Sequence, residues 1–216
     1  MAEALKGTKA HTRYYSENGA LLPGVTTITG MMDKPALVVW ANRLGLEGYD
    51  CTKYRDKAAE IGTCAHLRIL HYFKGTEPDL SEFSADVIDK SDNSMIKFYE
   101  WSKDFEIEPM HVEQPFISEK YKYGGTIDFY GLLNGRPCLL DFKTSKGIYE
   151  EMIMQVAAYY RLLRENKLDV KGASILRIGR DESEGFEYRV IDIGYLNKHW
   201  LMFKHLLSIY YLRKSL

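Results

Sequence analysis

The chain has 216 residues, of which 45% are hydrophobic and 27% are charged, and its formal net charge is −1 at pH 7. This composition excludes a largely disordered chain and suits a single filled core. The net charge gives no global basic field of the kind that attracts nucleic acids, so a nucleic-acid partner would need a local basic groove.

Location is indicated by three further features of the sequence. No apolar run is long enough to span a membrane, and the initial Met-Ala-Glu-Ala-Leu-Lys lacks the apolar core of a secretory signal. Cys51, Cys64 and Cys138 are scattered and form no Cys-x-x-Cys pair, which indicates reduced thiols and argues against a zinc or iron–sulfur site. We therefore expect one cytoplasmic domain over residues 1–216, with no membrane partner.

The first part of the chain, residues 1–108, is predicted to be mainly helical. Apolar residues recur there at helical spacing in two long segments, and Pro35 suits the first turn of a third helix. A Ser-Glu-Asn-Gly turn and a loop at 76–81 separate the elements. In chain order, we expect a strand at 12–15, a helix after Pro23 capped by Thr26 or Thr27, and helices at 35–45, 51–74 and 84–105.

The following part, residues 109–194, is predicted to form a sheet. In chain order, we expect strands at 111–118, 121–133 and 136–143, a helix at 150–166, strands at 173–178 and 186–193, and a closing helix at 195–213, within a final segment 195–216. The path from 136 to 178 is long enough for a parallel crossover. This order predicts an α/β fold, with a central mixed β-sheet flanked by helices and a helical N-terminal elaboration.

A β-hairpin brings two acidic residues together. Asn134-Gly135, between alternating apolar runs, favours a two-residue turn that pairs Leu133 with Arg136. Continuing that register places Asp128 directly across from Asp141, with Cβ atoms roughly 4.5–5.5 Å apart. Lys143, two residues further on, points to the same face as Asp141.

Like charges across a ladder are destabilising, so something must offset the repulsion. A shared proton, a neighbouring cation such as Lys143, or a bound divalent metal would each do so. For an arbitrary hairpin, a solvated surface pair is the ordinary interpretation.

More candidate residues lie on neighbouring elements. Gln155 and Tyr159 are spaced i, i+4 and share a face of the next helix. Glu113 lies on the preceding strand, and His66 ends the segment Gly62-Thr-Cys-Ala-His66 on an earlier helix. Taken singly, each is more typical of ordinary packing or exposed surface.

Together these motifs resemble the PD-(D/E)XK nuclease superfamily over about residues 60–160. The pattern is Gly125-Thr-Ile-Asp128, then Asp141-Phe-Lys143, then Gln155-x-x-x-Tyr159. It is most similar to the RecB-like exonucleases, including phage recombination and mitochondrial genome-maintenance exonucleases, in which an upstream Gly-x-x-x-His adds a metal-ligating histidine. The resemblance implies a restriction-endonuclease-like core and a DNA substrate. It also implies action in phage or bacterial recombination and repair, within the host cytoplasm.

The resemblance also implies residue roles. Asp128 and Asp141 would coordinate Mg2+ or Mn2+ with the backbone carbonyl of Phe142, His66 would ligate a metal, and Glu113 would complete a second site. Lys143 would orient or deprotonate the attacking water and hold the phosphate, so Asp128, Asp141 and Lys143 form the catalytic set. Gln155 and Tyr159 would position the substrate or brace the site. Basic residues would line a groove for the DNA backbone: Lys120, Lys122, Lys146 and Arg161.

The size of the reaction barrier favours a bound metal over a pair of carboxylates that share a proton. Hydrolysis of a phosphate ester requires removal of on the order of 20 kcal/mol of barrier. General acid–base catalysis supplies about 3–5 kcal/mol, whereas metal ions add charge neutralisation and an activated water.

The expected function is therefore a metal-dependent DNA exonuclease acting at linear ends. Expected partners are a single-strand annealing or binding protein and further copies of the chain. Three alternatives remain: an endonuclease of the same fold, a non-catalytic DNA-binding module on a degenerate nuclease fold, and a hydrolase of small phosphoesters.

Overall fold

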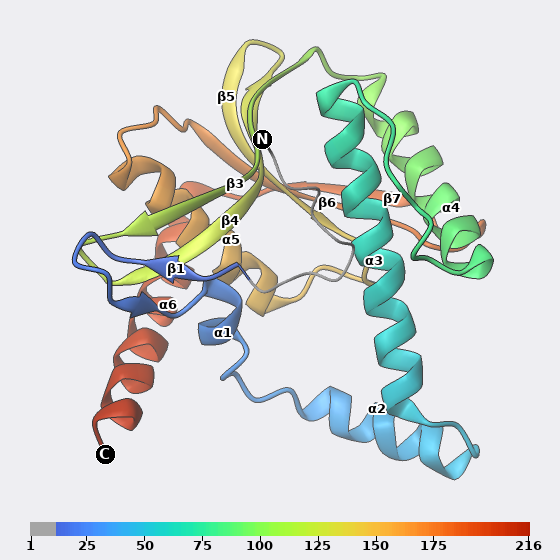
Figure 1. Ribbon diagram of the computed structural model, residues 1–216, viewed down its shortest axis with the longest axis horizontal. Helices are drawn as coiled ribbons and strands as arrows, with labels where there is room; N and C mark the ends of the chain where they lie inside the picture. The colour runs from blue at the N-terminus through green and yellow to red at the C-terminus, as the bar shows by residue number, and fades with distance from the viewer. Residues whose placement is uncertain (1–11) are drawn as a thin grey trace.

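The computed structural model describes residues 12–216 (Figure 1). The initial Met-Ala-Glu-Ala-Leu-Lys, for which no signal core is expected, lies outside the described residues. No helix in the described range has the length and apolar character needed to cross a membrane. The elements in chain order are β1 (Tyr14–Tyr15), β2 (Leu21–Leu22), α1 (Val25–Thr29), α2 (Pro35–Leu46), α3 (Cys51–Lys74), α4 (Ala85–Ser102), β3 (Ile107–Ser118), β4 (Tyr123–Leu133), β5 (Arg136–Lys143), α5 (Glu150–Glu165), β6 (Gly172–Ile178), β7 (Phe186–Val190) and α6 (Ile193–Ser215).

Local chemistry explains where the helices start and stop. The Asp50 side chain caps α3 by accepting from two backbone N–H groups, and Gly75 ends that helix in the left-handed region at φ +63°. Asp192 caps α6 by accepting from the N–H of Tyr195. This cap is why the preceding strand ends at Val190 and not at 193 as predicted.

The N-terminal prediction needs two corrections. Neither Thr26 nor Thr27 caps α1, because the helix begins directly after Gly24, whose extended backbone forms a parallel bridge with Gly124. The strand β2, which pairs antiparallel with β1, was not predicted, since two residues carry no detectable alternation.

The sheet is mixed, as the sequence predicts. Its strand order is β3-β4-β5-β6-β7, with β5 and β6 parallel and the other neighbours antiparallel. The helix α5 makes the crossover between β5 and β6. The α/β class, a mixed sheet flanked by helices, is confirmed.

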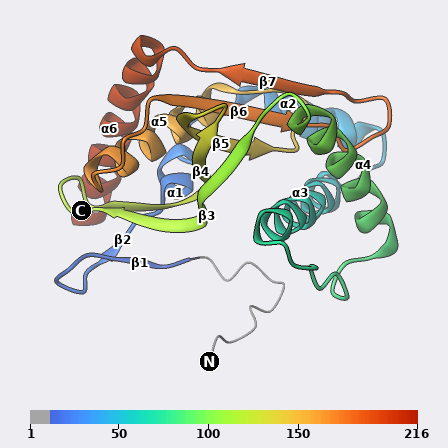
Figure 2. The same ribbon diagram turned by 90° about the horizontal axis from the view of Figure 1, so that it is seen from above.

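Helices cover both faces of the sheet (Figure 2). Leu139 and Ile175 point into a core shared with α1, α5 and α6. Leu140, Phe142 and Leu176 point the other way, into a second core shared with α3 and α4. Successive residues of β5 therefore serve opposite layers, as strand alternation requires.

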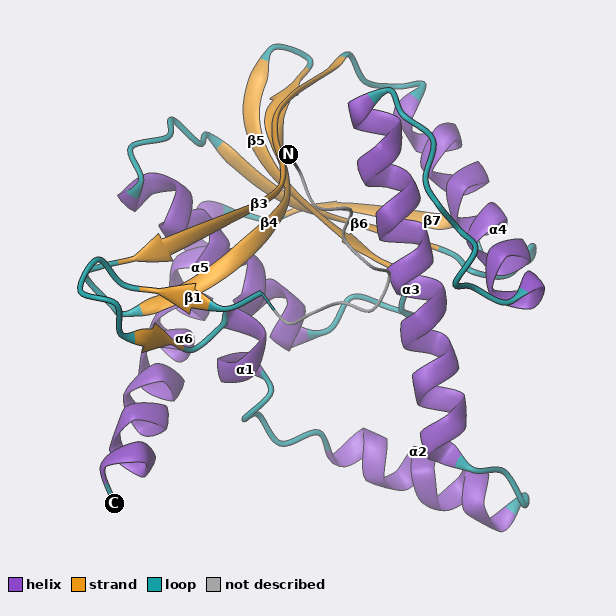
Figure 3. Cartoon of the chain, viewed as in Figure 1, coloured by secondary structure: helices purple, strands orange, loops and turns teal. Residues whose placement is uncertain are grey.

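The strand β4 changes its partnership along its length. From Phe129 to Leu133 it pairs with both β3 and β5, whereas from Tyr123 to Ile127 it pairs with β3 alone. Figure 3 shows the β3–β4 hairpin bending away from β5 at this point. We call this opening the fork, defined by the end of the β4–β5 ladder at Phe129 and Leu140.

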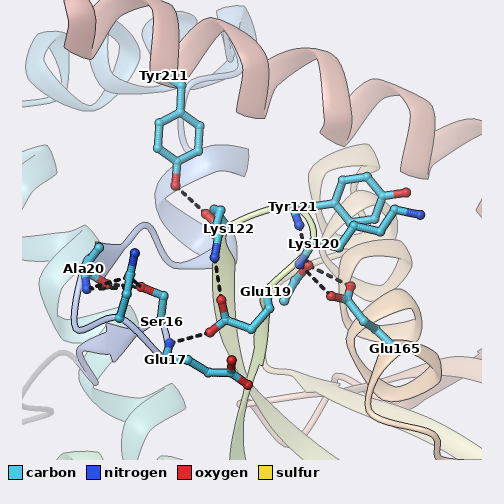
Figure 4. A network of polar contacts seen from close by, with 11 residues as sticks. Ser16, Glu17, Ala20, Glu119, Lys120, Tyr121, Lys122, Glu165 and Tyr211 are labelled. Atoms are coloured by element: carbon cyan, nitrogen blue, oxygen red, sulfur yellow. Dashed lines mark hydrogen bonds and ion pairs between the residues drawn. The ribbon is translucent and has the colours of Figure 1, made fainter.

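The tip of the β3–β4 hairpin is tied to its surroundings (Figure 4). Glu119 Oε1 accepts from the backbone N–H of Glu17 at 2.6 Å, and the backbone N–H of Lys120 donates to Glu165 Oε1 at 2.9 Å. The Tyr211 hydroxyl donates to the carbonyl of Lys122 at 2.5 Å. These bonds hold the tip of the hairpin to the β1–β2 turn, α5 and α6.

Candidate metal centre

Asp128 lies inside the fork. The hairpin register is the predicted one, with Leu133 opposite Arg136, but the ladder ends one step before Asp128 and Asp141 would pair. Instead, Asp128 Oδ2 accepts from the backbone N–H of Phe142 at 2.9 Å. The carboxylate therefore takes the place of the next ladder bond, and it satisfies a donor that the departing strand leaves open.

Three candidate ligands converge on this point from three elements. His66 on α3, Glu113 on β3 and Asp128 on β4 present ligand atoms that all lie within 4.8 Å of one another. His66 Nδ1 is 3.7 Å from both Glu113 Oε1 and Asp128 Oδ2. All three side chains are half-buried, so an ion held here would be reachable from solvent.

Glu113 has an unusual backbone for a strand residue. Its φ is +48°, in the left-handed region, where non-glycine residues are uncommon and cost on the order of 1–3 kcal/mol. It lies between the ladder pairs Val112–Phe129 and Gln114–Ile127, opposite Asp128, and does not pair itself. Such strain typically persists at functional sites, where the surrounding structure fixes it.

Asp141 and Lys143 form the second half of the site. Asp141 is fully buried, and Lys143 Nζ lies 2.6 Å from its Oδ2. In the described part of the chain, Asp141 Oδ1 has no hydrogen-bond partner. Burial raises the pKa of Asp141 to about 6, with a further contribution from the charge of Asp128, while Lys143 works against the rise.

The charge state of Lys143 follows from the same contacts. Burial acts to lower its pKa, but the negative charges of Asp141 and Asp128 outweigh burial and raise the pKa. Lys143 is therefore a persistent ammonium paired with Asp141.

The donor set fits a divalent cation. Buried carboxylate oxygens normally have hydrogen-bond partners or a cation beside them. A bound cation would stabilise both the unpartnered Oδ1 of Asp141 and the clustered ligands across the fork. Carboxylates suit Mg2+ and Mn2+, and an imidazole is accepted by transition metals. The predicted carbonyl ligand, Phe142, lies in the parallel ladder with Leu176 beside this site, and its role stays a prediction.

Gln155 and Tyr159 lie behind the hairpin. Gln155 Nε2 donates to the Tyr159 hydroxyl at 2.9 Å, and Tyr159 is buried. A Cβ at Gly125 would lie 2.5 Å from the Tyr159 ring, so the ring packs directly on the strand that carries Asp128. Burial raises the pKa of Tyr159 well above its usual value, with the charges of Asp128 and Asp141 adding to the rise. Of the two predicted roles, this placement favours bracing.

The basic residues do not gather as one groove. Arg161 follows Tyr159 by two positions, about 200° around the helix, and it donates to Asn197 on α6 at 2.6 Å. Lys122 pairs with Glu119, and Lys120 lies over the Tyr121 ring at the hairpin tip. Lys146 follows Lys143 by three residues in the loop after β5, which leaves it as the basic candidate adjoining the site.

Another residue near the fork was not among the predicted site residues. The Tyr14 hydroxyl and Thr126 Oγ1 lie 2.9 Å apart. Thr126 could have been singled out because it lies two residues before Asp128, whereas Tyr14 belongs to a two-residue strand far away in sequence.

Comparison with known proteins gives distant structural likenesses. No family model and no curated protein matches the chain. The fold is similar to that of a candidate exonuclease from Eubacterium rectale, with 12% identity and a TM-score of 0.47 over 69% of this chain and 64% of that one. It is also similar to LHK-Exo in complex with dAMP, with 11% identity and a TM-score of 0.36 over 74% and 90% of the two chains. The chain thus spans less than two thirds of the first protein, and at these values the function rests on the site itself.

Proposed function

We propose that the chain is a divalent-metal-dependent nuclease that removes nucleotides from the ends of linear DNA, in recombination or repair. The observation that carries the proposal is the fork, where His66, Glu113 and Asp128 converge beside the Asp141–Lys143 pair. The order of these residues along the chain is also the order of the nuclease motifs that the sequence resembles.

The residues present would hold Mg2+ or Mn2+ through His66, Glu113 and Asp128, whose ligand atoms lie within 4.8 Å of one another, and the unpartnered Oδ1 of Asp141 would be a further ligand. A bound ion supplies charge neutralisation at the phosphate and a more acidic water, which lowers the barrier by more than acid–base catalysis alone.

Lys143 contributes positive charge at a fixed place. Because its pKa is raised, it acts as a donor that holds a phosphate oxygen or a water, and a role as general base at neutral pH is disfavoured. Asp141 sets the position of that ammonium through the 2.6 Å contact. Tyr159 and Gln155 hold the strand of Asp128 from behind.

The test uses end-labelled linear single- and double-stranded DNA beside a covalently closed circle, with Mg2+ or with a chelator. We expect degradation of the linear substrates that requires Mg2+, while the circle stays intact. An Asp128→Asn variant should be inactive, and Asp104→Asn, an exposed carboxylate after α4, should match the parent.

The other functions have distinct outcomes in the same assay. Cleavage of the circle would identify an endonuclease. DNA binding without degradation would identify a non-catalytic module. Hydrolysis of a chromogenic phosphodiester as readily as DNA would identify a small-phosphoester hydrolase.

A further inference from the structure

Tyr14 occupies a gap that two glycines leave open. A Cβ at Gly124 would collide with the Tyr14 ring, and a Cβ at Gly24 would lie 3.2 Å from its Cε2. These two glycines also form the parallel bridge that joins the N-terminal segment to β4. The ring therefore packs against β4, and the hydroxyl is the part of the side chain that can form hydrogen bonds.

The hydroxyl lies close to the metal centre along β4. Gly124 and Thr126 face the side of the strand on which Tyr14 lies, and Asp128 follows at the point where the alternation breaks, since Ile127 packs in one core and Phe129 in the other. Thr126 is about 7 Å from Asp128 along the chain. Burial raises the pKa of Tyr14 and the charge of Glu113 raises it further, which indicates that Glu113 is near and that the hydroxyl keeps its proton.

A hydroxyl pair retains one free donor. Of the two O–H groups of Tyr14 and Thr126, only one is used in the 2.9 Å contact, and the other is available to an external acceptor. Both side chains are half-buried, so an acceptor can reach them from solvent.

A neutral donor suits this position. A lysine or arginine here would form an ion pair with Glu113 or Asp128, which would reduce its availability to a ligand. Hydroxyl groups make contacts to phosphate oxygens in nucleic-acid complexes without competing for the carboxylates.

We propose that the Tyr14–Thr126 hydroxyl pair binds a phosphodiester that adjoins the one at the metal centre. This inference rests on the proposed nuclease function and deepens it. With this second contact, the substrate is a polynucleotide strand that runs along β4 past both positions. A small phosphodiester would reach only the metal centre.

The test compares Tyr14→Phe and Thr126→Val with Tyr15→Phe, a control on the adjacent residue, which is 50% exposed. Tyr14→Phe keeps the ring in the glycine gap, so the fold should be retained. With a single-stranded oligonucleotide and Mn2+, we expect Tyr14→Phe and Thr126→Val to raise KM about tenfold, the typical loss for a hydrogen bond to a charged group, at similar kcat. With bis(p-nitrophenyl) phosphate, which has one phosphodiester, all variants should equal the parent.

A binding measurement separates this inference from the proposed function. Fluorescence anisotropy of the labelled oligonucleotide, in Ca2+ to limit turnover, should show about tenfold weaker binding for Tyr14→Phe than for Tyr15→Phe. Equal affinities, or no binding by the parent, would overturn the subsite. A parent that shows this difference but cleaves no DNA would overturn the nuclease function and leave the subsite standing.

Discussion

Asp128 Oδ2 accepts a hydrogen bond from the backbone N–H of Phe142 at 2.9 Å, where the ladder between their two strands has just ended. The same oxygen lies 3.7 Å from His66 Nδ1. The carboxylate of Asp128 thus accepts the backbone hydrogen bond that the ladder leaves open, and it also lies beside the other candidate ligands. Its structural and chemical contributions can be separated because an amide oxygen accepts a hydrogen bond but carries no charge.

Asp128→Asn should therefore fold and lose metal binding. The amide oxygen can keep the bond to Phe142, while the removed charge weakens the site. At tenfold excess of Mg2+ over its dissociation constant, linkage stabilises the parent by about 1.4 kcal/mol, or about 4 °C in Tm for a chain of this size. Thermal melts with and without Mg2+ should show this shift for the parent and little or none for Asp128→Asn. An equal shift in both proteins would place the ion elsewhere.

Lys143→Ala should separate chemistry from metal binding. Loss of the ammonium that holds phosphate or water should reduce the rate of DNA hydrolysis by about 10²–10⁴-fold. The Tm increase with Mg2+ should remain, since Lys143 is not a ligand. Lys146→Ala, three residues further on, should raise KM by a modest factor at unchanged kcat, because a backbone phosphate contact contributes to binding. Hydrolysis at the parental rate by Lys143→Ala would exclude the proposed role.

Much of this site could be predicted from local sequence. The Asn134-Gly135 turn fixes the hairpin register from Leu133–Arg136 to Phe129–Leu140, and Asp128 and Asp141 are the next residues beyond the end of that ladder. The i, i+4 spacing of Gln155 and Tyr159 likewise predicts their contact. These features depend on a turn or a helical repeat, both of which are short-range.

The parts that sequence could not give depend on long-range geometry. The departure of β4 from β5 moves Asp128 off the ladder. No residue near Asp128 in the sequence predicts this departure. The left-handed backbone of Glu113 is imposed by the hairpin, since glutamate has no intrinsic preference for that region. Tyr14 reaches Thr126 across 112 positions, through a gap made by two distant glycines.

The metal-free protein should lose stability as pH rises, because of Asp141. Its folded pKa of about 6 exceeds the usual 3.8, so folding favours the protonated form. The stabilisation from Asp141 is complete below pH 4 and is lost as pH rises through about 6, a change on the order of 3 kcal/mol. Asp141→Asn carries no titrating group there and should lack this loss.

Urea unfolding of the parent and of Asp141→Asn at pH 4.5, 6 and 8, with a chelator present, measures the difference. Groups remote from the site titrate alike in both proteins and cancel, whereas Lys143, Asp128 and His66 interact with Asp141 and contribute to the measured difference. The variant should therefore gain on the parent between pH 4.5 and 8. A constant difference between the two proteins would show that Asp141 titrates normally.

Gly62→Ala should weaken the metal site from a distance. A Cβ at Gly62 would lie 2.8 Å from Thr144 Oγ1, next to Lys143, so either the Thr144 side chain or α3 must shift to make room for it. His66 is one turn further along the same helix, and a displacement of α3 would move its imidazole away from Glu113 and Asp128. Metal-ligand distances tolerate only a few tenths of an ångström, so we expect about tenfold weaker Mn2+ binding by titration calorimetry.

The matched control is Gly45→Ala on α2, where nothing lies within 4 Å of the added Cβ. Alanine in a helix is favoured over glycine by up to about 1 kcal/mol, so this variant should be as stable as the parent or more so, with unchanged Mn2+ affinity. If Gly62→Ala bound Mn2+ as tightly as Gly45→Ala does, the position of His66 would not depend on the contact between α3 and Thr144. The distance between the histidine and the two carboxylates would then have to be set elsewhere in the fold.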